Sequence, residues 1–338
     1  MEKTLTIVIP TFNMEKYLNR CLDSLIIEKE IMNFLEVLVI NDGSTDSSSN
    51  IAHQYEIQYP ETFRVIDKIN GHYGSCVNRG IQEAKGKYFK VLDADDWFNT
   101  SELQKYLVQL NQLEDVDAVF TNWTLHNNIN KTKEASIKPQ YQLNKKIDTQ
   151  TLVLKLQSND FYALYGITYY TKLLRDINYH QTEGVCYTDT EYVYYPMMEA
   201  KTVAFIDVNL YQYYIGREGQ SVDPQVIQKN ISHYYKILQR ALSEYTSTTS
   251  DFQRTIQKYF FKTICSSFYF LCLSINSSNN TKKYNLKQID YQLKKISIDI
   301  YKSLNKVKYS KIPYIFIWRI FNLRFELFYN IRQKFKAI

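Results

Sequence analysis

The chain has little glycine and proline for its length, with nine Gly and six Pro among 338 residues. This excludes collagen-like and long low-complexity regions, which need far more of both residues. No stretch approaches the roughly 20 uninterrupted apolar residues of a spanning helix, so we do not expect the chain to cross a membrane. With 45% hydrophobic residues, it should bury a substantial core and fold as a globular protein.

The five cysteines are odd in number and form no CxxC pair, which is not the pattern of a disulfide framework. Met1 leads within a few residues into a strand-like apolar run, so no secretory leader is expected. A reducing cytoplasm is therefore the expected compartment. His72, His180 and His233 lack the spacing of metal ligands, and we interpret them as structural.

The positive charge of the chain is concentrated at one end. From Lys282 onward there are fourteen Lys and Arg against three Asp and Glu, a net of +11 that leaves −5 for residues 1–281. A strongly basic segment indicates an anionic partner, either a membrane surface or a nucleic acid.

Within this basic end, residues 311–338 interleave aromatic and aliphatic residues with Lys and Arg. The pattern predicts a basic amphipathic C-terminal helix that lies in the headgroup plane of an anionic membrane surface. The alternatives are that the helix packs on the body of the protein or makes a homodimer contact. The preferred interpretation places the protein in the cytoplasm, peripherally associated with the inner face of the plasma membrane, with no nucleic acid partner.

Apolar strands alternate with helical patterns through the first 121 residues. Strands are predicted over residues 4–10, 35–40, 63–66, 88–92 and 117–121, and helices over 14–30, after 46, and over 75–84 and 101–113. This order predicts a parallel sheet with helices on both faces. Residues 126–150 are polar and predict an excursion or mobile loop, whereas residues 225–275 predict helices.

Polar motifs follow three of the predicted strands, at Pro10–Asn13, Asn41–Asp46 and Asp93–Asp96. Ligands of parallel sheets bind beyond the carboxyl ends of the strands, so these motifs should converge. The carboxylates of KVLDADDW (Lys90–Trp97) would repel one another unless a cation lies among them, and oxygen ligands favour Mg²⁺ or Mn²⁺. The alternative is a solvated turn followed by a helix cap.

Three stretches resemble, in order and spacing, the nucleotide-sugar-binding half of family 2 glycosyltransferases: IPTFNMEKYLNRCLDSL, VLVINDGSTDSS and NGHYGSCVNRGIQEAKGKYFKVLDADDW. The resemblance covers about residues 4–121. It implies the α/β GT-A fold, a Rossmann-like, mostly parallel sheet with helices on both faces, followed by a mainly helical C-terminal region. The expected domains are a GT-A domain at 1–222, comprising a nucleotide-sugar-binding half (1–121) and an acceptor and catalytic-base half (122–222), then a helical region at 223–310 and the basic helix at 311–338.

The resemblance also implies roles for individual residues. Asp95 would bind the Mn²⁺ or Mg²⁺ ion through its DxD motif, Asp93 would contact the ribose or the metal's water shell, and Asp42 would accept from the uracil imide. Asp96 would only orient its neighbours or cap a helix. The other implied nucleotide-sugar-binding residues are Pro10, Thr11, Phe12, Asn13, Asn78, Arg217, Gln220 and Ser221. One departure is Val77, where many members have Arg before the Asn.

The segment YTDTEY (Tyr187–Tyr192) resembles the catalytic-base motif of inverting members, and Asp189 falls on the base position. Such a base removes the proton from the acceptor hydroxyl as that oxygen attacks the anomeric carbon. Glu191 is the nearby alternative. A further alternative is that one or both acids are structural ion-pair partners.

Together these features imply an inverting, metal-dependent glycosyltransferase that moves a hexose from a UDP-sugar to a hydroxyl of a glycan acceptor. The basic end suggests a lipid-linked oligosaccharide acceptor in capsule or exopolysaccharide synthesis. A dehydrogenase is disfavoured because no GxGxxG follows the first strand. A membrane- or nucleic-acid-associated binding protein with a vestigial nucleotide-sugar site is the alternative, which the two acid motifs and Arg217 disfavour.

Overall fold

The computed structural model describes residues 2–127, 132–137, 141–153, 164–216, 220, 224–274 and 277–325. The chain divides into two compact units, Met1–Gln220 and Ser221–Ile338. The division lies close to the predicted boundary after residue 222, and the predicted third region, 311–338, falls inside the second unit. Among the described residues, no helix combines the length and apolar character needed to span a bilayer.

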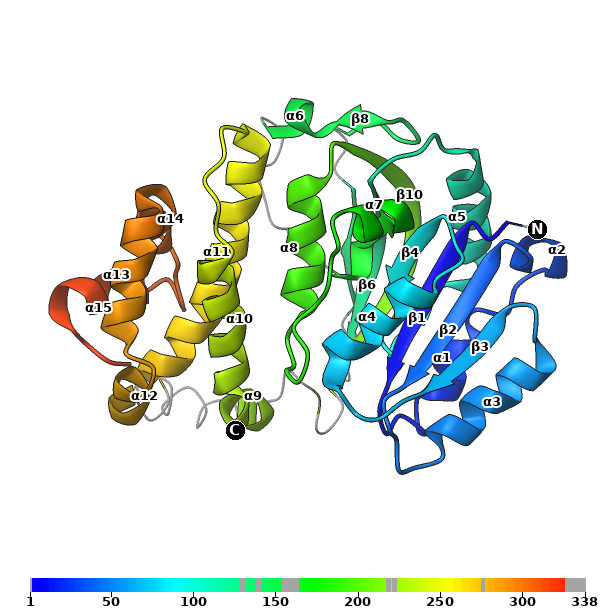
Figure 1. Cartoon of the computed structure of the whole chain (residues 1–338), viewed down its shortest axis with the longest axis horizontal. Helices are drawn as coiled ribbons and strands as arrows, with labels where there is room; N and C mark the ends of the chain where they lie inside the picture. Colours follow the sequence, from blue (N-terminus) through cyan, green and yellow to red (C-terminus); the bar gives the residue numbers. More distant parts are fainter. Residues whose placement is uncertain are drawn as a thin grey trace. The chain divides into compact units, whose positions relative to one another are not determined.

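One ten-stranded sheet organises the first unit. Its strands are β1 (Leu5–Thr11), β2 (Leu35–Asn41), β3 (Phe63–Asp67), β4 (Tyr88–Val91), β5 (Trp97–Phe98), β6 (Ala118–Asn127), β7 (Thr132–Ala135), β8 (Ile147–Asp148), β9 (Ile167–Tyr170) and β10 (Thr202–Ile215). The order is β3-β2-β1-β4-β9-β6-β10-β5, with β7 beside β6 and β8 beside β10. Figure 1 shows the strands β3, β2, β1 and β4 in succession.

The sheet is parallel where the sequence predicts it and mixed beyond. β3, β2, β1 and β4 run parallel to one another, and β1 and β2 are buried almost throughout. β9 runs antiparallel to both β4 and β6, β5 runs antiparallel to β10, and β6 and β10 are parallel. Antiparallel partners need no crossover helix, so the second half of the sheet departs from the predicted strand and helix alternation.

Helices cover both faces of this sheet. They are α1 (Leu18–Asp23), α2 (Lys29–Met32), α3 (Ser48–Gln58), α4 (His72–Glu83), α5 (Thr100–Gln112), α6 (Thr149–Leu152), α7 (Thr171–Asp176) and α8 (Asp189–Glu199), with a 3₁₀ turn η3 (Leu164–Gly166). Ile7 and Ile9 pack with residues of α1 and α5 in one core. Val8 between them faces α4, where a Cβ on Gly80 would lie 2.6 Å from Val8 Cγ2. Because strand side chains alternate, these contacts confirm helices on both faces.

Two local predictions are corrected. The predicted helix over 14–30 is two short helices, α1 and α2. The connection between them follows Ser24, whose hydroxyl accepts the N–H of Phe98 and donates to Cys21. Of residues 126–150, predicted as an excursion or mobile loop, those that the structure describes (126–127, 132–137 and 141–150) contribute the end of β6, the strands β7 and β8, and the start of α6. The residues of β7 are largely exposed, so its polar composition resembles that of a loop.

The second unit is helical, as predicted. Its helices are α9 (Pro224–Lys229), α10 (Ile231–Ser243), α11 (Asp251–Ser274), α12 (Ser277–Lys283), α13 (Leu286–Ile296), α14 (Ile298–Leu304) and α15 (Tyr314–Phe321). The long helix α11 is buried along much of its length and runs beside α10 (Figure 1). Its apolar residues therefore form the core around which this unit packs.

The predicted amphipathic helix over 311–338 is corrected for the part that the structure describes. The helix α15 ends at Phe321, followed by Asn322 in the left-handed conformation that commonly terminates helices. Ile315 and Trp318 are buried, and Arg319 forms a nearly buried ion pair of 2.6 Å with Asp290. This face of α15 packs within the second unit, which was the alternative interpretation. Residues 326–338 lie outside the described residues.

Candidate active site

The polar motifs after β1 and β2 interlock at one edge of the sheet. The backbone N–H of Asp42 donates to Thr11 O at 2.8 Å. Asn13 adopts a left-handed φ of 54°; its N–H donates to Ser44 Oγ at 3.0 Å, and its Oδ1 accepts from Thr45 N at 2.8 Å. The structure therefore brings Pro10–Asn13 and Asn41–Asp46 together.

Asp42 is buried in this edge beside a cation that our sequence reasoning missed. Its Oδ1 accepts from Lys68 Nζ at 2.5 Å and from Gly71 N at 2.9 Å. Lys68 comes directly after β3, at the same end of the sheet. Its position after a predicted strand could have identified it in the sequence as a residue near Asp42. Phe12 follows Thr11, whose carbonyl oxygen accepts from Asp42 N, and the Phe12 side chain is exposed.

The acidic turn after β4 is held from three directions. Asp93 Oδ1 accepts from Tyr73 OH at 2.8 Å, and Asp93 N donates to Tyr211 OH at 3.1 Å. The carbonyl oxygen of Asp95 accepts from Arg20 Nη2 at 2.6 Å. The contacts leave the two carboxylates of the DxD motif at the end of β4, beyond the sheet.

Asp96 has a different environment from its neighbours because it is fully buried. Its Oδ2 accepts from Tyr211 OH at 2.7 Å, and its Oδ1 accepts from Tyr214 N at 2.7 Å. Burial, and then the charges of Asp93 and Asp95, raise the pKa of Asp96 well above its usual range. Asp96 fastens the acidic turn to β10.

Asp189 is the first residue of α8, and its side chain reaches solvent. The protein surrounding this side chain still desolvates the carboxyl and raises its pKa, against the opposing effect of backbone hydrogen bonds. Glu191 is fully buried instead. Its two oxygens accept from the N–H and the hydroxyl of Thr182, each at 2.7 Å. Glu191 thus holds the segment before α8.

A group of four tyrosines lies among these acids; we refer to Tyr73, Tyr165, Tyr211 and Tyr213 as the tyrosine cluster. Tyr165 stacks on Tyr213 with ring centroids 4.1 Å apart and packs against Tyr211 at 5.0 Å. Burial, followed by electrostatic effects that include both Asp93 and Asp189, raises the pKa of Tyr73 and of Tyr165 well above the usual range.

The cluster therefore brings the acidic turn and Asp189 to the same region, although almost a hundred residues separate them in sequence. None of the four tyrosines was identified from the sequence, because thirty tyrosines are spread along the chain.

Two other predicted residues make contacts within the protein. Asn78 Nδ2 donates to Gln181 O at 3.0 Å and Glu183 Oε1 at 2.9 Å, and its Oδ1 accepts from Gln181 N at 2.7 Å. Gln220 is buried, accepts from Gly216 N at 3.0 Å and donates to Tyr214 O at 2.8 Å. Asn78 thus ties α4 to the segment before Asp189, and Gln220 folds against the end of β10. Arg217 and Ser221 lie outside the described residues.

The acidic turn fits a metal that is shared with a substrate. Among the described residues, no group of three or more His, Cys, Asp and Glu side chains could hold an ion by itself. Mg²⁺ is typically held by one or two carboxylates together with substrate phosphates and water. Asp93 and Asp95 supply such carboxylates at a strand end, where a diphosphate would complete the coordination.

Residues 6–177, just over half of the chain, match the model of glycosyl transferase family 2. The chain belongs to this family, which confirms the resemblance found in the sequence.

The curated relatives to which the chain is similar are also named glycosyltransferases. An uncharacterized glycosyltransferase of Mycoplasma pneumoniae is 41% identical over 102 residues, which are 30% of this chain and 34% of that protein. The putative glycosyltransferase EpsH of Bacillus subtilis is 30% identical over 138 residues, 40% of this chain and 39% of EpsH. The uncharacterized glycosyltransferase EpsJ of Bacillus subtilis is 25% identical over 215 residues, 62% of this chain and 60% of EpsJ. The chain thus spans less than two thirds of these relatives.

Solved structures show similarity over most of the chain. TarS of S. aureus (residues 1–349), in complex with UDP-GlcNAc, has a TM-score of 0.60 at 18% identity, covering 88% of this chain and 82% of that one. The mannosyltransferase PcManGT of Pyrobaculum calidifontis, in complex with GDP-Man and Mn²⁺, has a TM-score of 0.52 at 12% identity, covering 90% and 86%. At this identity the similarity concerns the fold, and it confirms the predicted GT-A fold with a helical C-terminal region.

Proposed function

We propose that the protein is an inverting, metal-dependent glycosyltransferase that moves a hexose from a UDP-sugar to a hydroxyl of a glycan acceptor. The observation that carries the proposal is geometric: Tyr73 of α4 donates to Asp93 Oδ1, and Asn78 of the same helix bonds the segment that precedes Asp189, where Gly184 N also donates to Gly71 O at 3.0 Å. A donor-binding carboxylate and a candidate base thus share one region, which a transfer reaction requires.

The donor would bind along the edge formed by the first, second and fourth strands. In this proposal Asp42 accepts from the uracil imide beside Phe12, with Pro10, Thr11 and Asn13 shaping the same edge. Solved structures of similar fold contain UDP-GlcNAc, or GDP-Man with Mn²⁺, which supports a nucleotide-sugar donor. Arg217 would contact the diphosphate, and Gln220 and Ser221 would close the loop that carries Arg217. Asn78 would support the donor site through the segment that it holds.

Asp189 would act as the general base. Its carboxylate takes the proton of the acceptor hydroxyl while that oxygen forms a bond to the anomeric carbon. The bond from the anomeric carbon to the diphosphate breaks, and the diphosphate leaves with the electron pair. A raised pKa suits this role because it makes the carboxylate a stronger base.

Asp93 and Asp95 would hold the Mn²⁺ or Mg²⁺ ion. A bound divalent ion neutralises the negative charge that develops on the departing diphosphate. Tyr73, which donates to Asp93 Oδ1, would fix the orientation of that carboxylate.

A titration of UDP into the protein, with and without Mn²⁺, tests the donor site. We expect Mn²⁺-dependent binding, loss of UDP-sugar turnover in EDTA, and recovery on adding Mn²⁺. Asp95→Ala should lower turnover at least about 100-fold, since it removes a metal ligand. Asp176→Ala, which removes an exposed aspartate at the end of α7, is the control. Absence of UDP binding in the presence of Mn²⁺ would contradict the proposal.

We further propose that the acceptor is a lipid-linked oligosaccharide in cell-surface polysaccharide synthesis, and that the protein binds the inner face of the plasma membrane from the cytoplasm. The support is charge: residues 221–338 carry twenty Lys and Arg against six Asp and Glu, a net of +14, while residues 1–220 have a net of −8. Anionic lipid attracts such a basic unit. Cells that lack the protein should accumulate the lipid-linked acceptor one sugar short, and unchanged glycans would contradict this assignment.

A further inference from the structure

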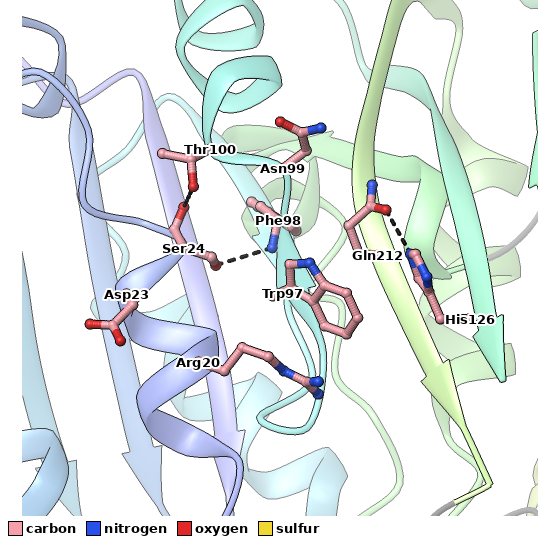
Figure 2. Close-up of a pocket in the computed structure, with 9 residues that line it drawn as sticks. All are labelled: Arg20, Asp23, Ser24, Trp97, Phe98, Asn99, Thr100, His126 and Gln212. Carbon is pink, nitrogen blue, oxygen red and sulfur yellow. Dashed lines mark hydrogen bonds between the residues drawn. The ribbon is translucent and has the colours of Figure 1, made fainter. Parts of the chain in front are cut away.

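An open pocket of about 590 Å³ lies beside the acidic turn, in the first unit (Figure 2). Residues from α1, β5, the start of α5, β6 and β10 line it, so it joins segments that are far apart in sequence. The polar and aromatic side chains that matter for its chemistry are Arg20, Asp23, Trp97, Asn99, His126 and Gln212. Pockets of roughly 300–1,000 Å³ bind small ligands, which places this one in the range for a sugar unit.

One wall of the pocket is a layered arrangement of flat groups. The guanidinium carbon of Arg20 lies 4.0 Å from the centre of the Trp97 ring. The centre of the His126 ring lies 4.9 Å from the centre of the Trp97 ring. Arg20 is also held by the carbonyl oxygen of Asp95. The wall is therefore fixed in place by the same turn that carries the DxD carboxylates.

The pocket presents both hydrogen-bond donors and acceptors. His126 Nε2 contacts Gln212 Oε1 at 2.8 Å, while the amide nitrogen of Gln212 donates to Asn209 O. This orientation of the amide makes Nε2 the protonated nitrogen of His126, which leaves Nδ1 as an acceptor.

Asp23, Asn99 and Arg20 also have hydrogen-bonding atoms that their contacts within the described residues do not use. The contacts within the described residues use only Oδ1 of Asp23, only Oδ1 of Asn99 and one N–H group of Arg20. The second oxygen of Asp23, the amide nitrogen of Asn99 and further donors of Arg20 remain able to bind a ligand.

The combination of hydrogen-bond donors, acceptors and aromatic rings in the pocket favours some classes of ligand over others. An anion would need donors alone, and the Asp23 carboxylate would repel it. An apolar ligand would desolvate the polar groups without replacing their hydrogen bonds, which costs free energy. A sugar ring offers hydroxyls that both donate and accept, and C–H faces that pack against aromatic rings.

We propose that this pocket binds a sugar unit of an extended glycan, at a place separate from the donor site. Gln212 reaches the pocket, whereas the next residue of β10, Tyr213, stacks on Tyr165 in the tyrosine cluster. Consecutive side chains of a strand point to opposite sides. A glycan in the pocket therefore leaves the nucleotide site accessible, and the contact between Arg20 and Asp95 makes the two sites neighbours.

We take this glycan to be the acceptor of the transfer reaction, an identification that rests on the proposed function. Sugar binding by the pocket does not depend on the proposed function. The test is calorimetric titration of the full chain with chitotetraose, maltohexaose and cellohexaose, each with and without UDP and Mn²⁺. We expect the protein to bind at least one of them in both conditions. His126→Ala and Asp23→Ala should each weaken that binding about tenfold, because each removes a hydrogen-bond acceptor for a sugar hydroxyl.

Tyr291→Ala is the matched control, because it removes an aromatic side chain that is 66% exposed in the second unit. UDP affinity should stay within about twofold of wild type in all three variants, which also verifies folding. If none of the oligosaccharides binds, or if the pocket variants bind as wild type does, the inference is wrong. If UDP fails to bind while the pocket variants lose oligosaccharide binding, the proposed function fails and the sugar site stands.

Discussion

Asp189 and Glu191 are two positions apart in α8, and their surroundings suit them to different tasks. Glu191 is fully buried, and both of its oxygens accept from Thr182. Asp189 reaches solvent at the start of α8, and desolvation by the surrounding protein raises the pKa of its carboxyl. The sequence placed both acids in one motif and preferred Asp189, but only the contacts of Glu191 give a physical reason for that preference.

Single substitutions test whether Asp189 is the base and Glu191 a structural residue. Asp189→Asn should lower sugar transfer by about 10²–10⁴-fold, the usual contribution of a general base, with UDP affinity unchanged. Glu191→Gln should instead lower the midpoint of thermal unfolding, because its amide nitrogen cannot accept from Thr182. Turnover and calorimetry measure the first effect, and thermal denaturation the second. Reversed effects would make Glu191 the base.

The pKa of Asp189 predicts the pH dependence of transfer. The base must be ionised, so kcat/KM should fall as the pH falls through the pKa of this carboxyl. Because desolvation raises that pKa above the usual range of an aspartate, the acidic limb of the profile should lie at higher pH than for an ordinary aspartate. Steady-state rates across the acidic range measure it. A limb that persists unchanged in Asp189→Asn would assign the titration to another group.

At the scale of elements, buried polar contacts decide which segments are fastened together. Asp96 joins the acidic turn to β10, Asn78 joins α4 to the segment before α8, and Arg319 joins α15 to α13. The sequence predicted the acidic turn, α4 and a helical C-terminal region from local apolar patterns, but it did not predict β10 or α8 as separate elements. The sequence did not predict the polar contacts between these segments, because a hydrogen bond between distant segments produces no local pattern in the sequence.

The Arg319 contact is expected to be a major determinant of the stability of the second unit. The guanidinium bonds Asp290, Tyr301 O and Asn305, and lies 3.6 Å from the centre of the Tyr301 ring. Arg319→Met should cost about 3–5 kcal/mol, because it leaves the Asp290 carboxylate without its cation. Urea denaturation followed by circular dichroism measures the loss.

Arg254→Met is the matched control, because it breaks the exposed pair of Arg254 with Asp251. Exposed pairs contribute at most about 1 kcal/mol. Equal losses in the two variants would contradict the importance assigned to burial.

On the scale of the whole molecule, the charge is divided between an acidic first unit and a basic second unit. The structure also sorts the apolar residues of α15. Ile315 and Trp318 face inward, whereas Phe316, Ile320 and Leu323 are 40%, 56% and 54% exposed. Positions 316 and 320 lie about one helical turn apart in α15, and Leu323 follows the end of that helix, so the described part keeps outward apolar side chains suited to lipid.

The proposed membrane binding can be measured by vesicle flotation. The full chain should float with vesicles that contain phosphatidylglycerol and stay behind with pure phosphatidylcholine, and high salt should weaken flotation by screening. Phe316→Ser combined with Ile320→Ser should reduce flotation, whereas Ile57→Ser, at an 80% exposed position of the first unit, should not. Equal flotation with both lipids, or no effect of the double variant, would contradict the proposal.

The sequence by itself determined the parallel strands β1 to β4, the polar motifs at their ends and the family. Each depends on residues that are close in sequence, such as an apolar run and the polar turn directly after it. The tertiary structure alone decided which residues meet across the fold. Asp96 and Tyr211 bond across 115 positions, and the tyrosine cluster and the pocket beside Trp97 each combine several elements. Such contacts depend on how strands pair and helices pack, which local periodicity does not record.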